Sequence, residues 1–211
     1  EPAAGAEGAV TGTVWRFRLA AVCLLLTTFA FLQSPGEIAA DTKLDLTVDP
    51  MGFLERALTL WDPQGFFGQL QNQAYGYLFP MGPFFAVGDL LALPPWVTQR
   101  LWWAGLLCVA FLGVVRLASL VLSTSSERPT GSHLRWAAVA AGLVYTLAPR
   151  IVTTLGPISA EALPMALAPW MVVPLVGADR GGSPRRMAAL SGLAVAGLGA
   201  VNAVAVRVVA A

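Results

Sequence analysis

Long apolar runs are the feature that most constrains what this chain can fold into. Four runs approach the roughly 20 residues that an α-helix needs to cross a bilayer core about 30 Å thick. They are Val14 to Leu32, Leu101 to Leu122, Trp136 to about Leu155, and Met187 to Ala211. A shorter run, Ala162 to Gly177, contains three prolines and is interpreted as a kinked span. We therefore predict an all-α polytopic membrane protein.

Composition supports this class and excludes others. Only 12% of the 211 residues are charged, whereas soluble domains carry about 25%. Mean hydropathy is +0.68 and the formal net charge is +1. These values exclude a disordered protein, a nucleic-acid binder and an ordinary cytosolic enzyme. Cys23 and Cys108 lie inside apolar runs, so neither a disulfide framework nor a thiolate metal site is indicated.

Basic residues between the runs predict the orientation, because Lys and Arg in short loops stay cytoplasmic. With Arg16 and Arg18 inside, the loops after the second and fourth spans also carry their arginines inside. This assignment requires 77–96 to be a juxtamembrane or re-entrant element, although a hydropathy plot could count it as another span. The first run also has the basic flank of a signal peptide. Its length favours a retained helix, since no small-x-small cleavage pattern follows promptly.

The predicted organisation has four parts. Residues 1–13 form an N-terminal tail, 14–33 the first transmembrane helix, and 34–98 a periplasmic acidic and aromatic loop. Residues 99–211 hold the further transmembrane helices, at about 99–122, 136–156, 162–178 and 187–211. The predicted location is the plasma (inner) membrane, with several spans and with the active site on the periplasmic face.

Acidic residues are concentrated in the predicted outer loop. Seven of the twelve lie between residues 34 and 98, and Asp41, Asp45 and Asp49 are spaced four apart. A carboxylate at the membrane surface could act as a general base, or it could bind a divalent cation such as Mg, Mn or Ca. The alternative is a solvated acidic loop. No His or Cys joins these carboxylates to make a distinctive metal pattern.

The same loop then becomes rich in aromatic and amide side chains. Trp61, Gln71, Asn72 and Tyr75 are the candidates for binding a sugar acceptor, because amides both donate and accept hydrogen bonds beside flat rings. The alternative for the aromatic residues is an interfacial belt at headgroup level.

Ionisable residues in or near the spans are more often functional than those elsewhere, because a charge in the bilayer is costly. Arg150 lies near the outer end of the third span, and Glu161 lies at the junction that follows it. Arg100 opens the second span on the same side. Arginines at this level could hold a lipid phosphate through bidentate hydrogen bonds. For Arg100 and Arg207, snorkelling to the interface is the favoured alternative.

Four sequence stretches resemble the mycobacterial arabinofuranosyltransferase D family. They are Ser34 to Pro50, Phe53 to Pro63, Tyr75 to Phe85, and Leu155 to Glu161. The resemblance implies a GT-C membrane glycosyltransferase fold, with this chain as an N-terminal fragment of a longer catalytic core. It implies transfer of arabinofuranose from decaprenyl-phosphoryl-arabinose to the arabinan of arabinogalactan and lipoarabinomannan. The implied partners are the bilayer, this donor, the arabinan acceptor and the remaining C-terminal part of the enzyme.

The resemblance also matches residues to roles. Such enzymes place a catalytic or metal-binding carboxylate just after the first helix, where Asp41 stands here. A second acidic residue often lies at the next outer loop, where Glu161 stands. We expect Asp41 to be the base and to be a metal ligand if a divalent cation is used, with Glu161 in support. Arg150 would bind the donor phosphate, and Lys43 and Arg100 are the further candidates for this role.

Two other functions compete with this reading. A transporter or flippase for a lipid-linked sugar would use the same arginines and carboxylates without chemistry, although no internal repeat is found. A non-catalytic scaffold for cell-wall assembly would have no need of the carboxylates.

Overall fold

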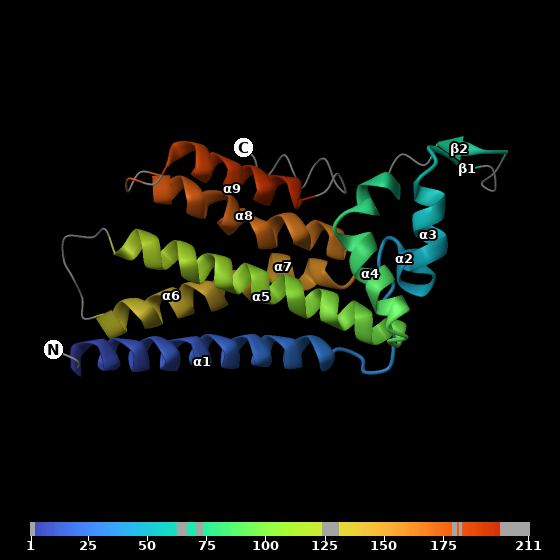
Figure 1. The fold of residues 1–211 in the computed structure, drawn as a ribbon. Coiled ribbons are helices and arrows are strands. Elements are labelled where there is room, and N and C mark those ends of the chain that lie inside the picture. Colours follow the sequence, from blue (N-terminus) through green and yellow to red (C-terminus); the bar gives the residue numbers. More distant parts are fainter. Residues whose placement is uncertain are drawn as a thin grey trace.

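The computed structural model describes residues 3–62, 67–70, 74–123, 131–178, 181 and 183–198. In Figure 1 the long helices run side by side along one axis. These are α1 (Ala3–Phe31), α5 (Pro95–Leu122), α6 (Gly131–Thr146), α8 (Ser159–Ala178) and α9 (Pro184–Ala196). Short elements gather at one end, which we call the loop end, and the N-terminus lies at the other. The predicted all-α membrane fold is confirmed.

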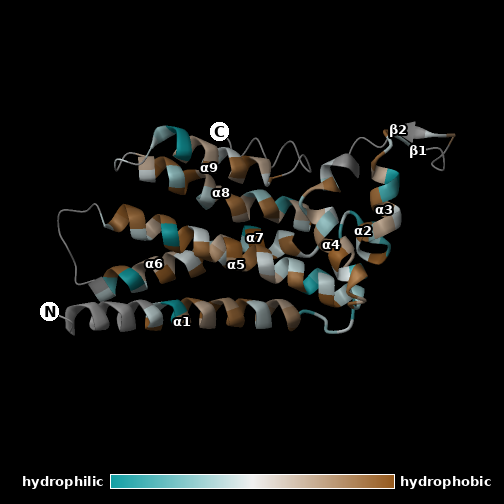
Figure 2. Cartoon of the chain, viewed as in Figure 1, coloured by the Kyte–Doolittle hydropathy of each residue, from teal (hydrophilic) through white to brown (hydrophobic). Residues whose placement is uncertain are grey.

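The described helices match most of the predicted spans. Thr13–Phe31 of α1, α5 and α8 are each long and apolar enough to cross a membrane. α1 begins at Ala3, inside the predicted tail. α9 covers the first part of the predicted last span, and residues 199–211 lie outside the described residues. In Figure 2 brown, the colour of hydrophobic residues, recurs along the ribbons of the long helices, as a lipid-facing bundle requires.

The third span is broken. α6 and α7 (Pro149–Leu155) meet at a bend of 49°, so together they form a broken span or a re-entrant loop. Pro149 stands at the first position of α7, where its missing N–H is tolerated. The break brings Arg150, the next residue, to the start of a short helix.

α8 stays helical through its three internal prolines because a neighbouring side chain compensates for a lost hydrogen bond. Pro169 has no N–H to donate to the carbonyl of Met165, four residues earlier. The Tyr145 hydroxyl of α6 donates to that carbonyl instead, at 2.8 Å. In a membrane, where water is absent, such replacement partners are what permits proline inside a span.

α5 is the central helix, and it packs against α1, α6 and α8. Its contact with α8 depends on Gly113, because a Cβ there would approach the Trp170 indole nitrogen to 2.7 Å. That indole N–H donates to the Val109 carbonyl at 2.9 Å. Small residues at such crossings let two membrane helices approach closely.

The loop end is built from short helices and a small hairpin. They are α2 (Leu44–Val48), α3 (Pro50–Ala57), the antiparallel pair β1 (Trp61–Asp62) and β2 (Gln69–Leu70), the 3₁₀ helix η1 (Ala74–Leu78) and α4 (Met81–Leu90). α4 has only 10 residues, about half the length that a span needs. The stretch 77–96 is therefore divided between short elements, as the charge-based orientation requires.

Two side chains of the first turns of α5 hold the connection after α1. The Gln99 amide makes two 2.9 Å hydrogen bonds to the backbone of Ala39, one to N–H and one to C=O. Arg100 is 1% exposed and donates to the carbonyls of Gln33 (2.9 Å), Glu37 (3.0 Å) and Ser34 (3.4 Å). Its guanidinium also stacks on Trp103, 4.1 Å from the ring centroid. This connection, residues 33–41, is thereby fixed to α5.

We expect Arg100→Met to unfold at lower temperature than the wild type. The substitution leaves several backbone carbonyls without donors, at a cost of about 3 kcal/mol. The measurement is the thermal unfolding midpoint of the purified protein in detergent. Arg116→Met is the matched control, since Arg116 lies on the same helix but is exposed. Equal midpoints for the two variants would show that Arg100 does not fix the connection.

Candidate active site

Asp41 is the buried carboxylate of the loop end, with 8% of its surface exposed. Its Oδ2 accepts a hydrogen bond from the Ser159 hydroxyl at 2.5 Å. The indole N–H of Trp102 donates to the same Ser159 oxygen at 3.2 Å, which leaves the hydroxyl proton directed at Asp41. The chain Trp102–Ser159–Asp41 therefore links α5, α8 and the connection after α1.

The remaining contacts of Asp41 come from backbone and from Thr42. Oδ1 accepts from the Thr42 N–H at 2.6 Å and from its hydroxyl at 3.3 Å. Oδ2 also accepts from the Ser159 N–H at 3.3 Å, at the positive N-terminus of α8. A carboxylate has about four acceptor positions, and protein donors approach all of them here, although the single Thr42 hydroxyl proton is shared between Oδ1 and the Pro157 carbonyl, each 3.3 Å away. The two 3.3 Å contacts are the weakest, so they are the ones that a substrate can displace.

The structure separates Asp41 from the two carboxylates that follow it in sequence. Asp49 caps α3 by accepting from the Gly52 N–H at 3.0 Å. Arg56 forms ion pairs with Asp45 (3.5 Å) and Asp49 (3.7 Å), and all three side chains are substantially exposed. Exposed pairs of this kind contribute little to stability. Asp45 and Asp49 thus have local roles on the surface, whereas Asp41 is enclosed.

Glu161 and Arg150 form an ion pair with an Nη2–Oε2 distance of 3.1 Å. Glu161 lies in the first turn of α8, two residues after Ser159, and its side chain is 20% exposed. Arg150 begins α7 and its side chain is 73% exposed. Two residues predicted for the site from separate spans are therefore in contact, with the guanidinium directed to the outside.

Tyr77 is a site residue that sequence reasoning missed. It lies in η1, is 3% exposed, and packs edge-on against Phe53 at 6.0 Å. The pKa of its hydroxyl is raised to about 12, first by burial and then by the negative charges of Asp41, Asp45 and Glu161, while a hydrogen bond with the Thr42 side chain acts to lower it. No local pattern marks Tyr77, because its partners lie in other segments.

Of the other two predicted phosphate ligands, Lys43 is a better candidate than Arg100. Lys43 is half-buried, two residues after Asp41, and precedes α2. The Nη1 of Arg100 donates to the Gln99 Oε1 at 2.8 Å, and its other nitrogens bind carbonyls as described above. This arrangement favours a structural role for Arg100 and leaves Arg150 and Lys43 as the candidates for phosphate.

The predicted sugar-binding residues are placed only in part. Trp61 lies in β1, is exposed, and its indole covers Gly68 of the hairpin, which projects from the loop end in Figure 1. Gln71 and Asn72 lie outside the described residues. Tyr75 belongs to η1, but its side chain is also outside what the structure describes.

The described residues do not form a protein cage for a metal. Among them no three His, Cys, Asp or Glu side chains come together closely enough to hold an ion. Asp41 is a single carboxylate whose acceptor positions are approached by protein donors. The described residues around Asp41 therefore do not fit a divalent cation bound by protein ligands alone.

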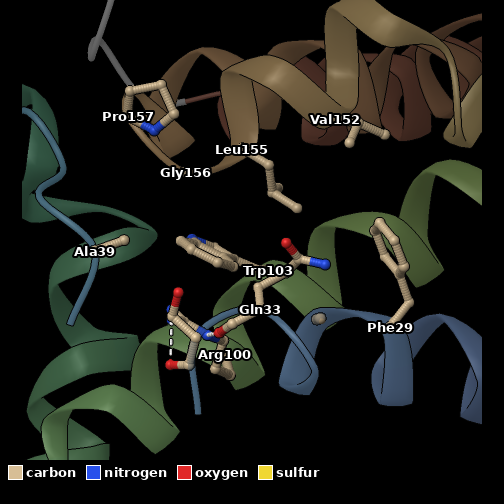
Figure 3. Close-up of a pocket in the computed structure, with 11 residues that line it drawn as sticks. Phe29, Gln33, Ala39, Arg100, Trp103, Val152, Leu155, Gly156 and Pro157 are labelled. Atoms are coloured by element: carbon tan, nitrogen blue, oxygen red, sulfur yellow. Dashed lines mark hydrogen bonds between the residues drawn. The ribbon is translucent and has the colours of Figure 1, made fainter. Parts of the chain in front are cut away.

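A cavity of about 240 Å³ lies beside the site, between the end of α1, the start of α5 and the end of α7. Figure 3 shows Phe29, Trp103, Val152 and Leu155 around it, with the Gln33 amide among them. Pro157 also lines it, and the Pro157 carbonyl accepts from the Thr42 hydroxyl at 3.3 Å. The cavity is smaller than the pockets of about 300–1,000 Å³ that enclose whole ligands. It can take a short apolar segment next to the polar site.

Comparison with known proteins places this arrangement in a family. Residues 25–211 match the family described as alpha-(1->3)-arabinofuranosyltransferase, N-terminal GT-C domain. The chain is 52% identical over 195 residues to the alpha-(1->3)-arabinofuranosyltransferase of Mycobacterium tuberculosis and 56% identical over 189 residues to that of Mycolicibacterium smegmatis. These matches cover 90% and 89% of this chain but only 13% and 12% of the relatives.

A solved structure agrees with the sequence comparison. The cryo-EM structure of the arabinofuranosyltransferase AftD from mycobacteria superimposes with a TM-score of 0.80 at 49% identity, over 92% of this chain and 14% of that one. The buried Asp41, its Ser159 partner and the helices that carry them lie within the matched region. The chain belongs to the alpha-(1->3)-arabinofuranosyltransferase family and corresponds to part of its N-terminal GT-C domain.

Proposed function

We propose that the full-length protein transfers arabinofuranose from decaprenyl-phosphoryl-arabinose to the growing arabinan of arabinogalactan and lipoarabinomannan. The observation that carries the proposal is the enclosed Asp41 carboxylate at the start of α8, with the Arg150–Glu161 pair on the same helix end. The relatives' names support arabinosyl transfer. The donor lipid and the acceptor are the finer parts of the proposal.

In the proposed reaction an acceptor hydroxyl attacks the anomeric carbon of the donor arabinose. The bond between that carbon and the phosphate oxygen breaks, and decaprenyl phosphate leaves with the electron pair. Asp41 accepts the proton of the attacking hydroxyl as general base. To do so it exchanges one of its 3.3 Å contacts, from the Thr42 hydroxyl or the Ser159 N–H, for the acceptor.

Ser159 and Trp102 act as positioning residues in this scheme. The 2.5 Å bond from Ser159 fixes one oxygen of Asp41, and Trp102 fixes the direction of the Ser159 hydroxyl. A base whose orientation is set before the substrate arrives loses less entropy in the transition state.

Arg150 is the proposed clamp for the departing phosphate, with Lys43 in support. The guanidinium is exposed and Glu161 engages it through Nη2, so Glu161 holds the arginine in place. The leaving phosphate gains negative charge as the bond breaks, and a positioned guanidinium stabilises that charge. Arg100 is not required for this step.

The proposed location of the site is the periplasmic face of the plasma membrane. Support comes from the distribution of arginines, because Arg16 and Arg18 lie near the start of the candidate span Thr13–Phe31 and Arg135 lies near the start of α6, away from the connection that carries Asp41. The positive-inside tendency places these arginines on the cytoplasmic side. Asp41 would be the residue that holds a divalent cation if transfer required one, and a chelator titration of the transfer assay tests that requirement.

We expect Asp41→Asn to lower arabinosyl transfer by about 100-fold or more, the usual contribution of a general base. Transfer is measured in membranes that carry the full-length protein, with decaprenyl-phosphoryl-arabinose as donor and a short arabinan as acceptor. Asp45→Asn is the matched control because it removes an exposed carboxylate only four residues later, in α2. Ser159→Ala should lower the rate less than Asp41→Asn, since it removes orientation and keeps the base.

The assay also separates the competing functions. Unchanged turnover in Asp41→Asn and Glu161→Gln would remove both residues from the site. If the wild-type protein moves the donor across the membrane but forms no arabinosylated product, a transporter or flippase is favoured. If the wild type shows neither transfer nor transport, the scaffold is the function that remains.

We expect Tyr77→Phe to lower the rate of transfer by about tenfold, the size of one lost hydrogen bond near charge. The raised pKa keeps the Tyr77 hydroxyl protonated far above neutral pH, so the loss should be the same from pH 6 to 9. The measurement is the pH profile of transfer for both proteins at matched expression. A loss confined to the alkaline side of this range would show that Tyr77 itself ionises during turnover.

A further inference from the structure

Two arginine–tryptophan pairs cross between α1 and α6 at the end of the bundle opposite the candidate active site. Arg18 of α1 lies over the ring of Trp136 of α6, with 5.3 Å between Cζ and the ring centroid. Arg135 of α6 lies over the ring of Trp15 of α1 at 5.6 Å. We call these four residues the crossed pairs. Figure 1 shows the start of α6 beside α1 at this end.

The arrangement follows from helix geometry. Trp15 and Arg18 are three residues apart, so they share one face of α1. Arg135 and Trp136 are neighbours near the start of α6. Each helix therefore offers one cation and one ring to the other. α5 packs against both α1 and α6.

The guanidiniums of the crossed pairs keep hydrogen-bond donors for an anion. Each lies within the range of about 6 Å of a cation–π contact with its ring, and each has five N–H donors, more than one ring contact can use. Arg18 and Arg135 are both exposed. Among the described residues, the salt bridges involve Arg56 and Arg150 at the loop end, and none involves Arg18 or Arg135. The structure thus presents two oriented cations without a carboxylate partner in the part of the chain that it describes.

The surroundings are those of a lipid headgroup. The crossed pairs lie near the start of the candidate span Thr13–Phe31. Phe17, between Arg16 and Arg18, is 71% exposed, and Leu24 and Leu25 are exposed about two turns further along α1. Trp136 is also exposed, at a level where tryptophan settles between headgroups and chains. An anion bound by the arginines would have an apolar surface directly below it.

We propose that the crossed pairs form a binding site for the phosphate of an anionic phospholipid, in the leaflet opposite the candidate active site. The guanidinium edges of Arg18 and Arg135 would bind the phosphate oxygens in the bidentate manner that suits this group. Trp15 and Trp136 would hold the guanidiniums in place, and the acyl chains would lie along Phe17 and Leu24. The site does not depend on the proposed transfer reaction.

The test is native mass spectrometry of the purified full-length protein, titrated in detergent with phosphatidylglycerol. Phosphatidylcholine and inorganic phosphate are titrated in parallel. We expect phosphatidylglycerol to bind most tightly and the double variant Arg18→Ala/Arg135→Ala to bind it at least about tenfold more weakly. Arg16→Ala is the matched control, because it removes one exposed arginine from the same turn of α1 outside the crossed pairs.

A second variant separates a shaped site from general charge. Arg18→Lys/Arg135→Lys keeps both positive charges but loses the planar stacking and the bidentate donors. We expect it to bind phosphatidylglycerol several-fold more weakly than the wild type, by about the worth of one lost charged hydrogen bond. Lysine variants that bind as tightly as the wild type would overturn the proposal, as would equal binding of phosphatidylcholine. Competition by inorganic phosphate at equal concentration would also overturn it, in favour of a site for free anions.

Discussion

The buried pairing of α5 with the connection after α1 is the constraint on which the rest of the loop end depends. Arg100 and Gln99 bind five backbone groups of residues 33–39, and Asp41 follows only two residues later. One helical turn further along, Trp102 reaches the start of α8 through Ser159. The position of Asp41 is therefore set by Gln99, Arg100 and Trp102, which lie within one turn of the same helix. A flexible connection of the same composition would leave the carboxylate in solvent.

The same interactions explain how a carboxylate can be enclosed at this place. A buried charge is costly unless donors surround it. The Ser159 hydroxyl and N–H, the Thr42 groups and the N-terminal dipole of α8 supply these donors. Asp45 and Asp49 do without them because they remain near the surface beside Arg56. Their difference from Asp41 is one of surroundings, since the three residues are chemically identical.

Sequence reasoning predicted the all-α membrane fold, its long apolar helices and the acidic loop, because hydropathy and charge distribution are local signals. The role of Asp41 stays a prediction. The same reasoning proposed Arg100 as a phosphate ligand, and the guanidinium is found among backbone carbonyls instead, an environment that no spacing reveals. The partners of Asp41 were not predicted because Ser159 is 118 residues away. Tyr77 was missed for the same reason: its relevance depends on the folding of η1 against Thr42. Local patterns predicted elements, whereas the site is made by contacts between them.

The small net charge of +1 conceals a separation of charge along the bundle. Acidic residues dominate the loop end, and arginines dominate the end where α1 and α6 meet. Arg56, Arg100 and Arg150 are the exceptions at the loop end: Arg56 pairs with Asp45 and Asp49 on the surface, and the other two differ in burial. Arg100 is enclosed, so its charge serves the fold. Arg150 is an exposed cation at an acidic end, and its ion pair with Glu161 leaves other guanidinium donors for a phosphate. An exposed ion pair adds about 1 kcal/mol at most, so stability alone is a weak reason for a cation at the bend of the broken span, and this is why we propose an anionic substrate as its partner.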